Sequence, residues 1–221
     1  MKLSKMPKKL KIGGRKYDII YPHLFTSDPR LLGLHEADQQ NIKLSKLFLG
    51  QQRHWNKICE TLLHETMHAV DHIYCHGVMQ ENEVYVMSNW MYQVIRDNNL
   101  NIKANILPKS VKIGGFVYKV QFPYVYNEGE ESLCTIEHER AEIRISASNS
   151  ASGPYGEAVI MANLIYLITC AICEMSTMPR GFTHGNKLEE LGFQNSFANG
   201  LHQVFMDNDL ETLLKSDGEK K

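Results

Sequence analysis

The sequence predicts an α+β protein built from two units of the same kind, each a small three-stranded sheet followed by two helices. A run at 7–22, PKKLKIGGRKYDIIYP, returns 101 positions later at 108–123 as PKSVKIGGFVYKVQFP. A second run, VIRDNNL at 94–100, returns 110 positions later at 204–210 as VFMDNDL. These repeats predict a tandem duplication in which the second unit has gained nine residues between the two runs.

The duplication fixes the expected domain boundaries. The first unit covers 1–103 and the second covers 104–215, and the polar residues 216–221 are expected to form a disordered tail. Units of about 100 residues can each bury a core.

Each unit opens with strands and closes with helices. A lysine-bearing strand, a Gly-Gly turn and a second strand predict a β-hairpin. The alternating runs NIKLS and EIRIS predict a third strand with one buried face. Apolar periodicity then predicts two helices in each unit, which we expect at 52–75 and 80–98, and at 156–175 and 186–207.

Composition narrows the class of protein. With 24 basic and 25 acidic residues and no basic stripe, the chain is not expected to bind nucleic acid. The longest apolar run, AVIMANLIYLITCAIC, is short for a bilayer and contains Asn163, so we expect a buried helix and no membrane partner. Five cysteines, an odd number, without a leading apolar segment favour the cytoplasm.

The segment TLLHETMHAV carries the chemistry of the first unit. His64 and His68 are one helical turn apart and project from one face, so both imidazoles can reach a single metal ion. Glu65 lies about 100° around the helix from His64, where it can face a water molecule at the metal without binding the ion itself. This pattern predicts a metal site with Glu65 as general base.

The following helix is expected to supply the third ligand. Glu83 is in phase with the apolar stripe that includes Met87 and Trp90, and a buried carboxylate is costly unless it is paired or bound to metal. Two His and one Glu with an open fourth position are typical of a catalytic zinc site, so we expect one zinc per chain. Three alternatives stay open: Glu81 or His72 as a ligand, and Asp71 as a support for an imidazole.

The second unit serves as an internal comparison. Pairing the repeats puts Tyr166 opposite His64, Leu167 opposite Glu65 and Cys170 opposite His68, and it puts Phe193 opposite Glu83. Four polar groups are replaced together by side chains that can fill a core. The second unit is therefore predicted to be metal-free.

The residues around the motif also resemble a known family. TLLHETMHAVDHIYC followed by ENEVYVMSNWMYQVIRDN resembles small phage and prophage zinc metallopeptidase-like proteins related to the ImmA/IrrE group, over most of the first unit. That group has an E-x-x-x-F-A helix whose Glu completes the zinc site, and here Glu83, Met87 and Ser88 stand at the Glu, Phe and Ala. The resemblance implies minimal gluzincin units, zinc ligands His64, His68 and Glu83, and Glu65 as general base.

Two functions remain open from the sequence. The first is a zinc-dependent peptidase that hydrolyses a peptide bond in a peptide or protein substrate, with Tyr74, Tyr85 or His72 as candidate oxyanion donors. The alternative is a phage accessory or regulatory protein that binds a partner through a metal-stabilised fold without turnover. A peptidase should present an open cleft beside the metal site, whereas a binding protein can close the fourth metal position with its own chain.

Overall fold

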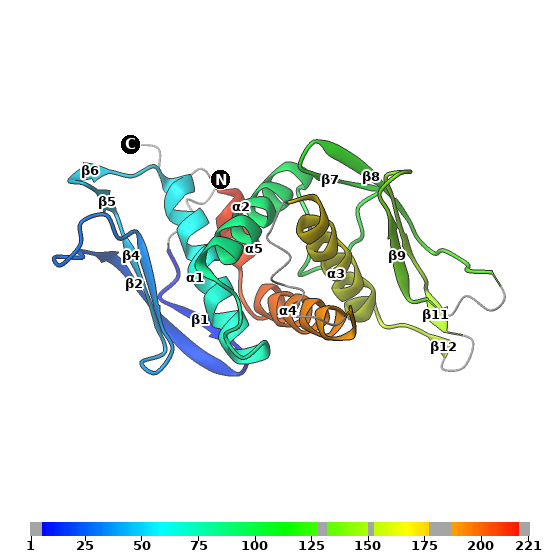
Figure 1. The fold of residues 1–221 in the computed structure, drawn as a ribbon, viewed down its shortest axis with the longest axis horizontal. Helices are drawn as coiled ribbons and strands as arrows, with labels where there is room; N and C mark the ends of the chain where they lie inside the picture. Colours follow the sequence, from blue (N-terminus) through cyan, green and yellow to red (C-terminus); the bar gives the residue numbers. More distant parts are fainter. Residues whose placement is uncertain (1–5, 128–131, 150–152, 177–186, 217–221) are drawn as a thin grey trace.

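The computed structural model describes residues 6–127, 132–149, 153–176 and 187–216. Two β-sheets lie at opposite ends of the molecule and the long helices pack between them, which gives a sheet–helix–sheet arrangement (Figure 1). The structure is therefore of the α+β class, as the sequence predicts.

The first sheet is formed by residues of the first half. It contains β1 (Lys9–Ile12), β2 (Arg15–His23), β3 (Gly33–Glu36) and β4 (Asn41–Ser45), in the order β1-β2-β4-β3. Strand β2 is antiparallel to β1 and parallel to β4, while β3 runs antiparallel to β4 at the edge of the sheet. A short hairpin of β5 (Leu47–Phe48) and β6 (Gln51–Gln52) follows.

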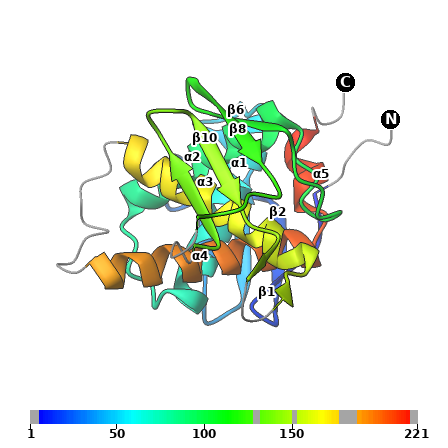
Figure 2. The same cartoon turned by 90° about the vertical axis from the view of Figure 1, so that its right-hand side faces the viewer.

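The second sheet has the same strand order. It contains β7 (Ser110–Ile113), β8 (Phe116–Gln121), β9 (Cys134–Glu137) and β10 (Glu142–Ile145), in the order β7-β8-β10-β9. The hairpin of β11 (Ser148–Asn149) and β12 (Gly153–Pro154) follows. Figure 2 shows this sheet facing the viewer with helix α3 behind it.

The expectation of three-stranded sheets was wrong, because each sheet has a fourth strand. Strands β3 and β9 are only four residues long, and most of their side chains are partly buried. Neither shows the alternation of buried and exposed residues that identifies a strand in a sequence. They are held as edge strands by antiparallel pairing with β4 and β10.

The helices lie close to their expected positions. They are α1 (Trp55–Tyr74) and α2 (Glu81–Asn98) in the first half, then α3 (Glu157–Met175) and α4 (Lys187–Asp207) in the second. A short helix that we did not expect, α5 (Leu210–Lys215), ends the described chain. Of the expected disordered tail only Ser216 is described, and its hydroxyl accepts a hydrogen bond from the Trp55 indole at 3.0 Å.

Helix α3 is long and apolar enough to cross a membrane by length and composition. In this structure it packs against β9 and β10 on one side and α2 and α4 on the other. Its residues Leu164, Ile168 and Ile172 are fully buried. The helix therefore lies inside the protein core, as the sequence predicts.

Candidate metal centre

Helix α1 places two histidines at the surface of the core. Its apolar face, which includes Leu62, Leu63 and Met67, is completely buried, whereas His64 and His68 remain partly exposed. The two Nε2 atoms are 3.1 Å apart, and the rings meet edge to face with centroids 4.7 Å apart. The helical spacing therefore brings both imidazoles to one point, as predicted.

A carboxylate from the start of α2 completes the group. One Glu81 oxygen lies 3.0 Å from the His64 Nε2, and the other lies 3.0 Å from the His68 Nε2. Two ligand atoms about 2.0–2.1 Å from a tetrahedral zinc are about 3.3 Å apart. The three side chains therefore have a spacing close to that of three zinc ligands, and they form the candidate metal group among the described residues.

Glu83, the expected third ligand, does not lie in this group. Its side chain is buried, and its Oε2 accepts a hydrogen bond from the backbone N–H of Gln80 at 2.7 Å in a capping box at the start of α2. The backbone N–H satisfies the buried carboxylate that we had expected a metal to satisfy. Glu81, which the sequence left as the alternative, takes its place beside the histidines.

The turn between α1 and α2 is what brings Glu81 to the histidines. Asp71 is buried on α1, and its two carboxylate oxygens accept the backbone N–H groups of Val78 and Met79 at 3.2 and 3.1 Å. Together with the Glu83 cap, these bonds hold the segment that leads into α2. Asp71 therefore fixes the turn and does not contact an imidazole through any described hydrogen bond.

The donor set fits a cation. Two imidazole nitrogens and a carboxylate face one another at about hydrogen-bond distance, and such acceptors repel unless a proton or a metal ion lies between them. Burial lowers the pKa of His64, with a further contribution from His68, so its ring is neutral at neutral pH. A neutral imidazole is the form that binds zinc.

Ser88 orients one of the rings. Its hydroxyl donates to the Tyr85 carbonyl at 3.0 Å and lies 3.4 Å from the His64 Nδ1. Because the hydroxyl proton is used on the carbonyl, the serine oxygen can accept a hydrogen bond from the Nδ1–H of His64. That tautomer leaves the Nε2 lone pair directed at the metal position.

Glu65 lies next to the metal group in a buried position. Its side chain accepts a backbone hydrogen bond from His35 on β3, and burial together with the charge of Glu81 raises its pKa to about 8. The edge strand passes very close, because a Cβ built on Gly33 would lie 2.4 Å from the Glu65 Oε1 and 2.6 Å from the Thr61 Cγ2. Only glycine at this position leaves room for the Glu65 carboxylate.

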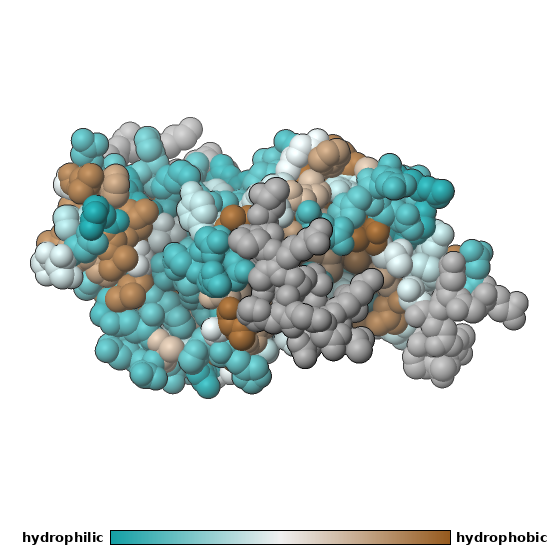
Figure 3. Space-filling view, in the orientation of Figure 1, coloured by the Kyte–Doolittle hydropathy of each residue, from teal (hydrophilic) through white to brown (hydrophobic). Residues whose placement is uncertain are grey.

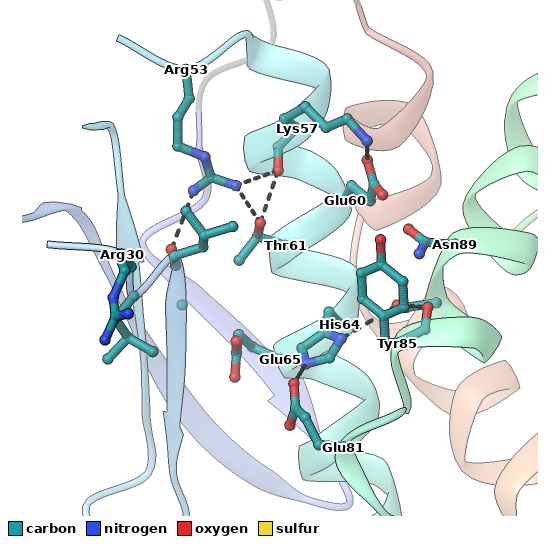
Figure 4. Close-up of a pocket in the computed structure, with 14 residues that line it drawn as sticks. Arg30, Arg53, Lys57, Glu60, Thr61, His64, Glu65, Glu81, Tyr85 and Asn89 are labelled. Carbon is teal, nitrogen blue, oxygen red and sulfur yellow. Dashed lines mark hydrogen bonds and ion pairs between the residues drawn. The ribbon is translucent and has the colours of Figure 1, made fainter. Parts of the chain in front are cut away.

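A pocket of about 460 Å³ opens beside the metal group. His64, Glu65 and Glu81 line one part of it, Leu31 to Gly33 form the wall on the β3 side, and Tyr85 and Asn89 form the wall on α2. Glu65 and Tyr85 lie on opposite sides of His64 (Figure 4).

The far end of the pocket is basic. Arg53 donates to the carbonyls of Leu32, Ser45 and Lys57 and to the hydroxyl of Thr61, which ties α1 to the strands. The described contacts give the guanidinium no ion pair with a carboxylate, although the charge of Glu60, which also lines this end of the pocket, acts on it. The metal group and this cation are therefore joined by one open groove.

Two of the three candidate oxyanion donors lie elsewhere. The Tyr74 hydroxyl donates to the Gln203 side chain at 3.2 Å, on the opposite half of the molecule, and His72 does not line the pocket. Tyr85 lines the pocket and its side chain is 60 % exposed. It is the one of the three candidates that lines the pocket beside the metal group.

The corresponding positions of the second half carry no histidine and no acid. Leu167 and Cys170 are buried on α3, and the Cys170 thiol lies 3.3 Å from the Gln194 side-chain oxygen. Cys134 occupies the place of Gly33 in the repeat, and Leu191 occupies the place of Glu81. The substitutions therefore extend to the edge strand and to the acid that meets the histidines in the first half.

Comparisons of the chain with protein-family models, with curated proteins and with solved structures find no match.

Proposed function

We propose that the chain is a zinc-dependent peptidase whose single metal site consists of His64, His68 and Glu81, with Glu65 as the general base. The observation that carries this proposal is the joint position of a three-ligand group, a buried carboxylate of raised pKa and an open pocket. A metal that only stabilised the fold would need neither an open pocket nor a buried carboxylate beside it. The open pocket is the feature that favours turnover over the alternative of a phage accessory binding protein.

The proposed roles follow from what each group can do. A bound zinc would polarise a substrate carbonyl and lower the pKa of a water molecule. Glu65 would take the proton from that water at its carboxylate and later deliver it to the leaving amine. Tyr85 would donate its hydroxyl proton in a hydrogen bond to the substrate oxygen, and Ser88 would hold His64 in the tautomer that binds metal.

The pocket surroundings support a peptide as substrate. Strand β3 is an edge strand, and its residue Gly33 lies on the pocket wall. Leu31 lines the pocket, and the nearby hairpin tip carries Phe48 and Leu49, which are 44 % and 59 % exposed. Exposed apolar side chains gather over this end of the molecule in Figure 3. We infer that these side chains contact apolar residues of an extended peptide.

We further propose that the two halves are tandem copies of one minimal gluzincin-like unit, of which the second has lost its site. The repeat of the sequence at 101 and 110 positions and the identical strand order of the two sheets support this reading. The resemblance of the first half to the ImmA/IrrE group is consistent with it.

The test compares the parent protein with Glu65→Gln on a peptide library and on unfolded protein substrates. The Gln side chain keeps the shape of Glu65 but cannot accept the proton, so zinc should be retained while cleavage falls by at least about 100-fold. Cleavage at an unchanged rate would refute the mechanism. Absence of cleavage by zinc-loaded parent protein across the library would favour the binding protein.

A further inference from the structure

The two halves exchange helices across the middle of the molecule. Helix α4 of the second half packs against β1 of the first, and helix α2 of the first half packs against β7 of the second. Helix α4 also packs along α1, which carries the histidines. Each hairpin is therefore covered by the last long helix of the other half.

The contacts at one of these interfaces are specific hydrogen bonds. Asn208, the residue directly after α4, accepts the Lys11 backbone N–H and donates to the Lys11 carbonyl, both at 2.9 Å. The Gln203 side chain accepts the Gly13 backbone N–H at 2.9 Å, and Asp207 pairs with the Lys11 ammonium at 2.9 Å. The edge of β1 and the turn that follows it are thus bound by the C-terminal end of α4 and the residue after it.

The other interface repeats the same bonds with the repeat-related residues. Asn98 on α2 accepts the Lys112 N–H at 2.5 Å and donates to the Lys112 carbonyl at 2.8 Å. Gln93 accepts the Gly114 N–H at 3.0 Å, and Asp97 pairs with the Lys112 ammonium at 3.0 Å. The two interfaces are equivalent, as in a twofold-symmetric dimer, where both partners use the same patch.

These contact residues are identical in the two halves. Gln, Asp, Asn, Lys and Gly occupy both sets of positions, whereas every residue of the metal group differs between the halves. The interface has therefore been retained in the half that lost the metal ligands.

Two pairs of related positions break the symmetry. On α2, Trp90 packs over the Gly114 turn, and a Cβ on that glycine would come 2.8 Å from the indole. The residue related to Trp90 on α4 is Gly200, and there Tyr74 of α1 fills the space, 2.5 Å from where a Cβ on Gly200 would stand. The residue related to Tyr74 is Ser176, by the same alignment that sets Tyr166 opposite His64. At the interface of α2 with β7 the large side chain, Trp90, comes from α2. At the interface of α4 with β1 the large side chain, Tyr74, comes from α1, the helix that carries the histidines.

We propose that the second half is a dedicated dimerisation partner for the first, and that the Tyr74–Gly200 contact lets the metal-bearing half pair with the second half but not with another copy of itself. Two metal-bearing halves would bring Trp90 of one against Tyr74 of the other, at a place with no room for even one carbon atom. This inference holds whether or not the site is hydrolytic.

The first test is made on the full chain. It places a large residue at Gly200 and then a small residue at Tyr74. Gly200→Trp should lower Tm by about 5 °C or more through overpacking. Adding Tyr74→Ser recreates the Trp and Ser arrangement of the other interface and should recover at least half of that loss. Gly192→Trp is the matched control, because this glycine lies on the same helix with none of the described atoms within 4 Å of its Cβ position, and its Tm should change little.

Additive losses in the double variant, or a Gly200→Trp protein as stable as the control, would overturn the pairing role of Tyr74. Zinc content is measured alongside to verify that the first half stays folded in each variant.

The second test cuts the connection between the halves. A protease site is inserted after the exposed Ala104, in the turn that joins them, and the cleaved protein is examined by native mass spectrometry. We expect one species that contains one first half and one second half. Free halves, or pairs of two first halves, would overturn the proposal.

Discussion

The identity of the third metal ligand gives the sharpest test of the site, because Glu81 and Glu83 are two residues apart and have different environments. Glu81 meets both histidines at 3.0 Å, whereas Glu83 is bonded to the Gln80 N–H. Replacing Glu81 by Gln therefore removes one of the three proposed metal ligands, whereas replacing Glu83 by Gln removes one charge from a helix cap.

The expected magnitudes differ clearly. Zinc bound by a full set of protein ligands gains roughly 10–16 kcal/mol, so one of about four ligands contributes on the order of 3 kcal/mol, or about 100-fold in Kd. Glu81→Gln should weaken zinc binding by about that factor and leave the Tm of the zinc-free protein nearly unchanged. Glu83→Gln can still accept the Gln80 N–H, and loss of its charge at the helix start should cost about 0.3–1 kcal/mol of stability.

The assay is competition for zinc with a chromophoric chelator, with circular dichroism to check that each variant folds. A loss of zinc affinity in Glu83→Gln with little change in Glu81→Gln would refute the assignment. Equal losses in both variants would show that the turn, and not the Glu81 carboxylate alone, controls the site.

Three further outcomes follow from the same contacts. Ser88→Ala should weaken zinc binding by about 10-fold, since it frees the His64 ring, and an unchanged Kd in the chelator assay would contradict the hydrogen bond. Gly33→Ala should displace Glu65, lower the free energy of unfolding by roughly 1–3 kcal/mol and lower the cleavage rate. A fully active variant would contradict the close approach of Gly33 to the Glu65 carboxylate. The pKa of Glu65 is raised to about 8 in the folded, zinc-free protein, so the folded state keeps a proton that the unfolded state loses above pH 4.5. Stability of the zinc-free protein should therefore fall as pH rises from about 4.5 to 8, by up to a few kcal/mol, and Glu65→Gln should remove this part of the pH dependence in urea titrations.

Strong periodic signals in the sequence predicted much of the fold. Helices α1 and α2, the Gly-Gly hairpins and the pairing of His64 with His68 follow from local spacing, so they could be expected without tertiary information. The fourth strands could not, because β3 and β9 exist through pairing with a distant strand and lack alternation of their own.

The third ligand shows where an argument from burial falls short. The position of Glu83 on a buried stripe was predicted correctly, but a backbone N–H can satisfy a buried carboxylate as well as a metal can. The Gln80-to-Glu83 spacing was the available signal for a capping box. The place of Glu81 depends on the turn that Asp71 holds, and no local pattern encodes that geometry.

The packing of α2 and α4 against the opposite halves could not be predicted from the sequence either. The runs VIRDNNL and VFMDNDL were recognised as a repeat, but their shared Asp and Asn could not be assigned a partner. The structure gives the reason for their identity, since Asn98 and Asn208 bind equivalent strand edges.

The measurement that tests the metal centre most directly is an anomalous difference map at the zinc edge, from crystals of the protein purified without chelator. The account predicts one peak per chain, about 2.0–2.2 Å from the Nε2 atoms of His64 and His68 and from a carboxylate oxygen of Glu81, and no peak in crystals of His68→Ala. Absence of a peak in the parent protein, a second peak in the other half, or a peak bound by Glu83 in place of Glu81 would contradict it.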